Sequence, residues 1–182
     1  MKKIISILYV AIISLAFSQI ASAQISVNSG SNSSESGKIK LGGGLAFGTE
    51  VEELGIQAGG VYTINEDFRA GADFIYYLTG DDSDFGANFT WWEFNANGHY
   101  LFLSEEDMIV YALGGLNFAS FSYDFNFEGF GGGSVSETEI GLNVGAGIEY
   151  GLGFADLYGE LKYALSSADQ LVLSAGLRFP IN

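Results

Sequence analysis

The sequence predicts an all-β protein, an eight-stranded antiparallel up-and-down transmembrane β-barrel with a polar, plugged lumen. Three observations predict this fold. Apolar and polar residues alternate with period two through eight segments, the connections between segments differ in length in a regular way, and the charged residues of the segments share one face. A composition of 48% hydrophobic residues with 26 glycines also differs from that of an acidic disordered chain. The apolar residues must therefore be buried against protein or lipid.

The N-terminus has the features of an export signal. Two lysines precede an apolar run at 4–17, and the small residues at 21–23 form an A-x-A cleavage motif. We expect a cleaved secretory signal peptide at residues 1–23, which is too short to anchor the chain as a membrane helix. Ser-, Asn- and Gly-rich residues 24–37 predict a flexible leader, and residues 38–182 are expected to form the barrel. Because the chain has no cysteine, it has no disulfide, thiolate metal site or lipidated cysteine.

The charge of the chain argues against two classes of partner. The sequence contains 7 Lys and Arg against 22 Asp and Glu, a formal net charge of −15. Lys2 and Lys3 belong to the predicted signal peptide, so the mature chain is more acidic still. Nucleic acid and anionic membrane surfaces would repel such a chain, and we expect it to bind neither through its net charge.

The alternating segments predict the strands. Their ranges are 38–48, 53–63, 68–79, 89–102, 108–121, 137–150, 154–165 and 171–179. Most are near the length that a tilted membrane strand needs. The fifth segment fits least well because both of its faces are apolar, and we place Asn117 inward and Phe118 outward.

The connections predict the orientation of the barrel. The second, fourth and sixth connections are the tight turns INED, SEED and GLG, whereas two of the odd-numbered connections are long. Bacterial outer-membrane barrels have short periplasmic turns and longer extracellular loops, so both termini are expected on the periplasmic side. We therefore expect extracellular loops at 80–88 and 122–136.

The segment GLNVGAGIEYG, residues 141–151, resembles a slightly stretched G-x-G-x-x-G nucleotide fingerprint. That fingerprint needs a strand before the glycines and a helix after them, because the helix N-terminus supplies the anion-binding amides. The residues that follow here, GFADLYGELKYAL, alternate with period two and predict another strand. We interpret the glycines as lumen-facing residues that leave room for long side chains, and we expect no cofactor.

The more apolar face of each segment is expected to point outward. Aromatic residues stand at both ends of this face and flank a middle of Leu, Val, Ile, Ala and Gly, as in the girdles of membrane barrels. The predicted periplasmic girdle consists of Tyr62, Phe68, Tyr100, Phe102, Tyr150 and Phe179. The predicted extracellular girdle consists of Phe47, Tyr76, Trp92, Phe118 and Tyr163.

The opposite face carries a predicted network of lumen charges. Its members are Lys40, Arg69, Asp73, Glu93, Glu149, Asp156, Glu160, Lys162 and Arg178. Each charge would cost a few kcal/mol if it faced lipid, whereas opposite charges can pair across a narrow lumen. By depth we expect two groups. Near the periplasmic end lie Lys40, Arg69 and Arg178 with Glu149 and Asp156, and nearer the middle lies Lys162 with Asp73, Glu93 and Glu160.

Residues 38–182 resemble a known family in this pattern and in the phrases GLNVGAGIEYG, DLYGELKYAL and LSAGLRFP. They are similar to the small eight-stranded outer-membrane barrels that include OmpA and OmpX, especially the Bacteroidetes-type outer membrane protein beta-barrel domain. The resemblance implies a barrel in the bacterial outer membrane and names no activity. Family members often end on an aromatic residue that the barrel-assembly machinery reads, whereas here Phe179 is followed by Pro180, Ile181 and Asn182.

Two groups of residues are candidates for catalysis or metal binding. Some eight-stranded barrels use His, Ser and an acid on lipid A, but the only histidine, His99, is expected inward near the periplasmic end, and the nearest serine in sequence, Ser104, lies in a turn. We therefore expect no enzymatic activity and a hydrogen-bonding role for His99. The acidic residues Asp81, Asp82 and Asp84 are weak candidates for a cation site, because they lack the spacing of an EF-hand loop. The simpler interpretation is an acidic loop exposed to solvent, and we expect no bound metal ion.

These observations favour a non-enzymatic integral outer-membrane barrel with a structural or cell-surface interaction role carried by its extracellular loops. The expected partners are outer-membrane lipid and lipopolysaccharide, the barrel-assembly machinery and a loop partner that the sequence does not identify. The barrel is expected to be a monomer. One alternative is a narrow channel for small or apolar solutes, and another is a soluble secreted barrel that binds a small apolar ligand.

Overall fold

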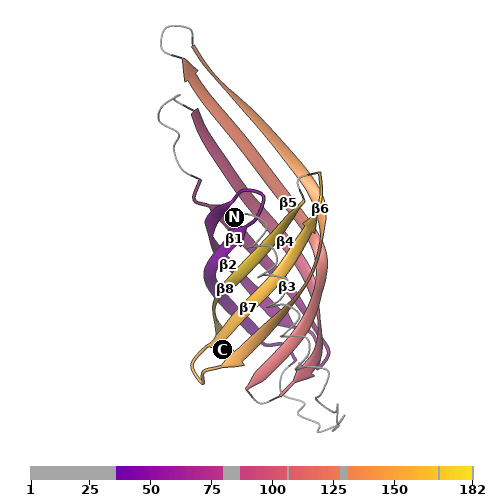
Figure 1. Ribbon diagram of the computed structural model, residues 1–182. Coiled ribbons are helices and arrows are strands. Elements are labelled where there is room, and N and C mark those ends of the chain that lie inside the picture. Colours follow the sequence, from indigo (N-terminus) through magenta and orange to yellow (C-terminus); the bar gives the residue numbers. More distant parts are fainter. Residues whose placement is uncertain (1–35, 80–86, 106, 128–130, 168, 182) are drawn as a thin grey trace, which may run out of the picture. The chain divides into compact units, whose positions relative to one another are not determined.

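The described residues form a closed antiparallel barrel of eight strands, as the sequence predicts (Figure 1). The computed structural model describes residues 36–79, 87–105, 107–127, 131–167 and 169–181. Each strand pairs with its neighbour in the chain, and the first also pairs with the last, which closes the barrel. The strands are β1 (Ile39–Gly48), β2 (Glu53–Thr63), β3 (Phe68–Tyr77), β4 (Ala87–Ser104), β5 (Met108–Phe127), β6 (Gly131–Gly151), β7 (Asp156–Leu165) and β8 (Gln170–Ile181).

The predicted signal peptide, most of the predicted leader, and Asp81, Asp82 and Asp84 lie outside the described residues. The last two leader positions are held against the barrel. Ser36 Oγ donates a hydrogen bond to the Ile64 carbonyl at 2.8 Å, and the Gly37 N–H donates one to the Thr63 carbonyl at 2.8 Å. The chain therefore enters the barrel beside the turn between β2 and β3.

The tight turns contain residues suited to them. Between β2 and β3, Asn65 Oδ1 accepts hydrogen bonds from the backbone N–H groups of Asp67 and Phe68, at 3.0 and 2.9 Å, which closes an Asx-type turn. Between β6 and β7, Gly153 has φ 86°, a left-handed conformation that glycine adopts without strain. These side-chain and backbone preferences explain why INED and GLG are short connections.

Three strands are much longer than predicted. β4, β5 and β6 contain 18, 20 and 21 residues, whereas the other five described strands contain 10 to 12. The prediction of a long loop at 122–136 was wrong for most of that segment, because β5 runs to Phe127 and β6 begins at Gly131. Period-two alternation continues through SYDFNF and SVSETE, and the intervening run of glycines suggested a loop where the strands form a hairpin.

The added length forms a sheet that continues beyond the barrel. The last pair between β3 and β4 is Tyr76 with Trp92, and the last pair between β6 and β7 is Leu142 with Leu165. Beyond these pairs, the strand partners of β4, β5 and β6 among the described residues are only one another, and the Phe89 carbonyl of β4 accepts a hydrogen bond from the Thr79 hydroxyl. We call this part, residues 87–91, 119–127 and 131–141, the projecting sheet. Figure 1 shows β5 and β6 extending well past the short strands.

Successive residues of each strand face alternately the interior and the exterior of the barrel. The buried positions, such as Gln57, Glu93 and Lys162, therefore alternate with exposed apolar positions along every strand. The described residues contain no helix that is long and apolar enough to cross a membrane. The interior is consequently mainly polar, and the apolar surface of the barrel is on the outside.

Candidate functional site

An ion-pair cluster fills the interior near the end of the barrel where β1 begins and β8 ends. Arg178 Nη2 lies 2.7 Å from Glu160 Oε1, and Arg178 Nη1 pairs with Glu149 Oε1. Arg69 Nη1 lies 2.9 Å from the other oxygen of Glu149. Lys40 Nζ lies 2.7 Å from Asp156 Oδ2 and 3.7 Å from Glu149 Oε2. Among the described residues, this arginine cluster combines three cations with three carboxylates, so its charges balance.

Aromatic rings hold the arginine cluster in place. Tyr111 OH donates a hydrogen bond to Glu160 at 2.6 Å and accepts one from Arg178 at 3.1 Å. The guanidinium of Arg69 lies 5.0 Å from the centre of the Tyr111 ring, and that of Arg178 lies 4.2 Å from the Tyr158 ring. Both arrangements are cation–π contacts, which favour a fixed guanidinium plane. The cluster therefore occupies the lumen as one unit connected by ion pairs and ring contacts, in which Arg69 Nε and Nη2 have no hydrogen-bond partner among the described residues.

The middle of the lumen is crosslinked mainly by amides. Asp73 accepts hydrogen bonds from Gln57 at 2.8 Å and Asn95 at 3.2 Å, and lies 3.5 Å from Lys162 Nζ. Asn143 Nδ2 donates to Asn95 at 2.9 Å and to a second asparagine, Asn97, at 2.9 Å. These bonds join β2, β3, β4, β6 and β7, so the amide layer ties together opposite walls of the barrel.

Glu93 lies further toward the projecting sheet and differs from the other lumen carboxylates. It has no ion-pair partner among the described residues, and only 1% of its surface is exposed. Instead it accepts hydrogen bonds from Tyr77 OH at 3.3 Å, from Asn117 Nδ2 at 3.0 Å and from Gln170 Nε2. Neutral donors therefore satisfy this buried carboxylate.

The depth grouping expected from the sequence needs one correction. Glu160 pairs with Arg178 in the arginine cluster, not with Lys162, and Glu93 pairs with neither cation. The long Arg178 side chain reaches Glu160 although the residue directly opposite Arg178 is Asp156. The position of a residue along its strand predicts the depth of its Cα atom in the barrel. The long side chain of an arginine can nevertheless contact a residue more than one strand position away.

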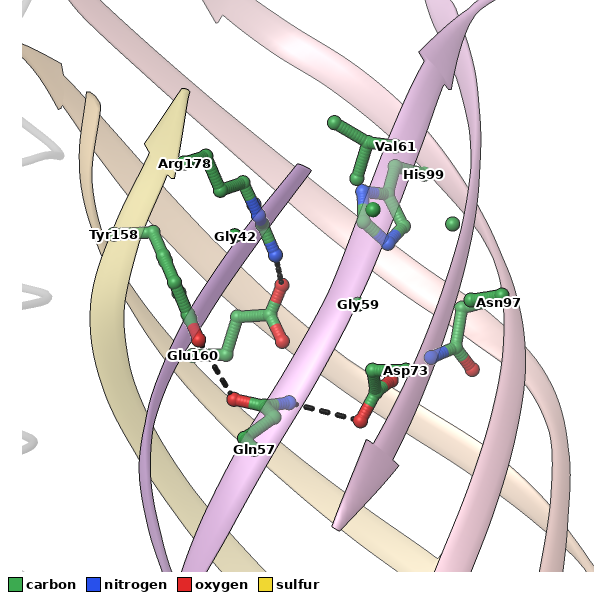
Figure 2. A pocket seen from close by; sticks show the side chains of 13 residues that line it. Gly42, Gln57, Gly59, Val61, Asp73, Asn97, His99, Tyr158, Glu160 and Arg178 are labelled. Carbon is green, nitrogen blue, oxygen red and sulfur yellow. Dashed lines mark hydrogen bonds and ion pairs between the residues drawn. The ribbon is translucent and has the colours of Figure 1, made fainter. Parts of the chain in front are cut away.

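Figure 2 shows the small cavity between the arginine cluster and the amide layer. Gln57 bridges Tyr158 and Asp73 there, because its Oε1 accepts a hydrogen bond from Tyr158 OH at 2.8 Å and its Nε2 donates to Asp73. His99 lines the cavity and stacks on Tyr111 with ring centres 4.7 Å apart. The cavity volume is about 20 Å³, which is room for one water molecule.

His99 is buried, with 3% of its surface exposed, and its Nδ1 has no hydrogen-bond partner among the described residues. Ser104 stands exposed at the end of β4. The structure thus does not bring His99 and Ser104, the candidate catalytic residues, together. Within the described ranges, no three His, Asp or Glu side chains are placed to hold a metal ion.

An apolar cap closes the other end of the lumen. Trp91, Tyr77, Ile75, Ala46 and Val172 form a buried cluster, and the partly buried side chains that pack against it are Val51, Phe89 and Phe121. The rings of Trp91 and Phe121 meet edge to face with their centres 4.4 Å apart. This cap was not predicted, although the inward parity of Trp91 and the apolar inward residues near the strand ends indicate it in the sequence.

The residues of the two predicted girdles lie on the outward face. Trp92 and Phe118 are partly buried by neighbouring rings, and the others are 36–51% exposed. Phe68 lies beside Tyr100 with ring centres 5.4 Å apart, and Trp92 stacks on Phe74 at 5.6 Å. Further outward aromatic residues that the girdle prediction did not include are Phe74, Phe94 and Phe154. Phe74 and Phe94 share the outward parity of their strands and could have been found.

The projecting sheet has two different faces. On the face that continues the lumen side, Phe89 pairs with Tyr123, and Tyr123 pairs with Val135. Tyr123 and Val135 are 49% and 63% exposed, so apolar surface stands open above the cap. On the other face the strands present hydroxyl side chains, which are Thr90, Ser122, Ser134, Ser136 and Thr138, while Ser120 on the same face is buried.

Solved structures share this architecture, whereas no protein-family model and no curated protein sequence matches the chain. The Ail protein of Yersinia pestis, solved with the heparin analogue sucrose octasulfate, has a TM-score of 0.59 and 16% identity over 79% of this chain and 97% of Ail. The N-terminal barrel of Pseudomonas aeruginosa OprF has a TM-score of 0.59 and 14% sequence identity over 80% of this chain and 98% of the OprF barrel. Neisserial surface protein A has a TM-score of 0.58 and 21% sequence identity over 78% of this chain and 95% of that protein. The chain therefore has the fold of the small eight-stranded outer-membrane barrels that include OmpA and OmpX.

Proposed function

We propose that the protein is a non-enzymatic outer-membrane barrel whose projecting sheet binds another protein at the cell surface. The observation that carries this proposal is the difference between a filled lumen and an open sheet. Side chains of the arginine cluster, the amide layer and the apolar cap occupy the lumen, whereas the projecting sheet leaves apolar side chains and strand edges uncovered among the described residues. A surface of this kind is typical of interaction sites.

The outward face of the barrel supports a membrane location. Leu45, Ile56, Leu142 and Val144 are each more than half exposed, and aromatic residues stand at both ends of the same face. Water would solvate such a face poorly, while a bilayer with aromatic residues at its interfaces matches it. We infer that the end with the tight turns is periplasmic and that the projecting sheet is extracellular.

The partner is expected to use the edges as well as the apolar face of the projecting sheet. Residues 87–91 of β4 and 131–141 of β6 each have one side without a strand partner in the described part of the chain. Unpaired backbone N–H and C=O groups of this kind can bond to an extended segment of another protein. Tyr123 and Val135 would supply apolar contacts next to these edges.

The charge of the chain argues against a sulfated sugar as the ligand, although Ail was solved with such an analogue. Recognition of sulfate groups relies on Arg and Lys. The sequence has no Lys or Arg at 41–68, 70–161 or 163–177, so the connections between strands carry none. Lys40, Arg69, Lys162 and Arg178 are engaged inside the lumen.

The two alternative functions find less support. A channel needs a continuous path, and the cavity beside His99 holds about 20 Å³. A soluble ligand-binding barrel needs an apolar cavity of about 300 Å³ or more. Here the equivalent space is occupied by residues such as Arg69, Lys162 and Glu93.

Site-specific photo-crosslinking on intact cells tests the proposal. A photoreactive amino acid at Val135 or Tyr123 should give a defined adduct with another protein. The matched control is Leu165, which is similarly exposed but lies on the outward face of β7 and should contact lipid. Adducts at Leu165 but at neither sheet position would contradict a binding role for the projecting sheet. A surface label that reaches Ser104→Cys but not Val135→Cys in intact cells would reverse the orientation.

A further inference from the structure

The outer face of the projecting sheet changes character abruptly where the barrel wall ends. The row Phe94, Phe118 and Ile140 is apolar, and Phe94 and Phe118 have ring centres 6.2 Å apart. The next row contains Ser120 paired with Thr138, beside Trp92. The row after it contains Thr90, Ser122 and Ser136, with Ser122 Oγ 3.3 Å from Ser136 Oγ. Ser120 is buried, with 5% of its surface exposed, and we call the exposed and partly exposed hydroxyl residues of these two rows, Thr90, Ser122, Ser136 and Thr138, the hydroxyl face.

We propose that the hydroxyl face docks against the sugar headgroups of lipopolysaccharide in the outer leaflet. The inference rests on the proposed membrane location. The face is continuous with the outward aromatic residues, so it must point toward the lipid molecules that surround the barrel. With a rise of about 3.4 Å per residue and a tilt of about 40°, the two rows stand about 5 and 10 Å above Phe118. That height corresponds to the headgroup layer, about 5–8 Å thick on each side of a phospholipid bilayer and thicker where sugars are attached.

The chemistry of the hydroxyl face matches a sugar-phosphate layer. Each Ser or Thr hydroxyl can donate one hydrogen bond and accept two, which suits sugar hydroxyls that also do both. Phosphate oxygens accept hydrogen bonds and repel carboxylates. In a chain with 22 acidic residues, neither row of this face contains one.

The two acidic residues of β6 that alternate with these rows lie on the opposite face. Glu137 pairs with Phe121, and Glu139 pairs with Ala119, both on the side that continues the lumen. A sheet that met only water would need no such separation, because carboxylates on either face would be solvated equally.

Cysteine labelling provides the test, since the chain has no cysteine of its own. Ser136→Cys would report on the hydroxyl face. The matched control is Val135→Cys, the adjacent residue on the opposite face, which has almost the same height. Each full-length variant would be inserted into phospholipid vesicles with and without lipopolysaccharide and treated with a membrane-impermeant maleimide. Labelling at Ser136→Cys should slow about tenfold in the presence of lipopolysaccharide, which corresponds to about 1.4 kcal/mol in favour of the covered state. Labelling at Val135→Cys should be unchanged.

The outcomes separate this inference from the proposed function. Equal labelling rates at Ser136→Cys in both membranes, or equal slowing at both positions, would overturn the docking of the hydroxyl face. Loss of the protection when Mg²⁺ is chelated would also overturn it, because the contact would then depend on bridging cations. Failure of the variants to insert, judged by a gel migration that does not change on heating, would instead contradict the membrane barrel itself.

Discussion

At the scale of single residues, Glu149 has the largest number of charged contacts in the lumen among the described residues. It pairs with Arg69 and Arg178 and lies within 4 Å of Lys40. Neutralising it leaves these cations with only Glu160 and Asp156 as counterions. Because the cluster is buried, water cannot replace the lost partner, and the remaining charges are destabilised.

We therefore expect Glu149→Gln to lower the free energy of unfolding by about 3 kcal/mol, the order that breaking a buried ion pair costs. Urea unfolding of the membrane-inserted barrel measures this change in the free energy of unfolding. The control is Glu66→Gln in the exposed β2–β3 turn, which should change stability by less than about 0.5 kcal/mol. Combining Glu149→Gln with Arg69→Gln should cost less than the sum of the two single changes, because the two residues share a contact. Equal stability of Glu149→Gln and Glu66→Gln would contradict the network.

The glycine residues of the sixth strand have a further role that the sequence did not reveal. A Cβ atom at Gly145 would collide with the carbonyl oxygen of Leu161 and lie 2.9 Å from the Cα of Lys162. Gly145 therefore permits close approach between β6 and β7 in addition to leaving room in the lumen. Gly98 on the outward face differs, since its nearest neighbour would be 3.8 Å away.

This difference predicts opposite results for two alanine substitutions. Gly145→Ala should destabilise the barrel by about 1–3 kcal/mol, the range for an overpacked interior. Gly98→Ala should be close to neutral, because its methyl group would have ordinary contacts. Thermal unfolding followed by gel migration compares the two variants directly. A Gly145→Ala barrel as stable as the Gly98→Ala barrel would show that β6 and β7 are not in such close contact.

At the scale of elements, β4 separates two environments with adjacent tryptophan residues. Trp91 belongs to the buried cap and contacts Phe121, whereas Trp92 stacks on the outward-facing Phe74. A shift of β4 by one residue would exchange them, because successive strand residues point to opposite faces. The two side chains therefore report on the register of the whole strand.

Fluorescence of single-tryptophan variants measures this register. In Trp91→Phe, the remaining Trp92 should be quenched strongly by lipids brominated in their acyl chains. In Trp92→Phe, the remaining Trp91 should be quenched little. Similar quenching in both variants would contradict the inward and outward assignment of β4.

At the scale of the whole molecule, the sequence predicted the strand number, the antiparallel order and the outward face. Period-two alternation specifies these features locally, so even Asn117 and Phe118 of the ambiguous fifth segment lie on the faces expected. The projecting sheet was missed because its glycine-rich hairpin tip resembles a loop in composition. The pairing of Glu160 with Arg178 was not predicted, because the position of a residue along its strand does not show how far its side chain extends across the lumen.

The central claim is that the barrel is closed and that its function lies outside the lumen. The arginine cluster, the amide layer and the apolar cap follow one another along the barrel, and the cavity between the first two has room for one water molecule. The most direct test is single-channel recording of the purified full-length protein in a planar bilayer. Because side chains fill the lumen, we expect no steady conductance above that of the bare membrane. Large, reproducible single-channel steps from the unmodified protein would contradict it and would favour a channel.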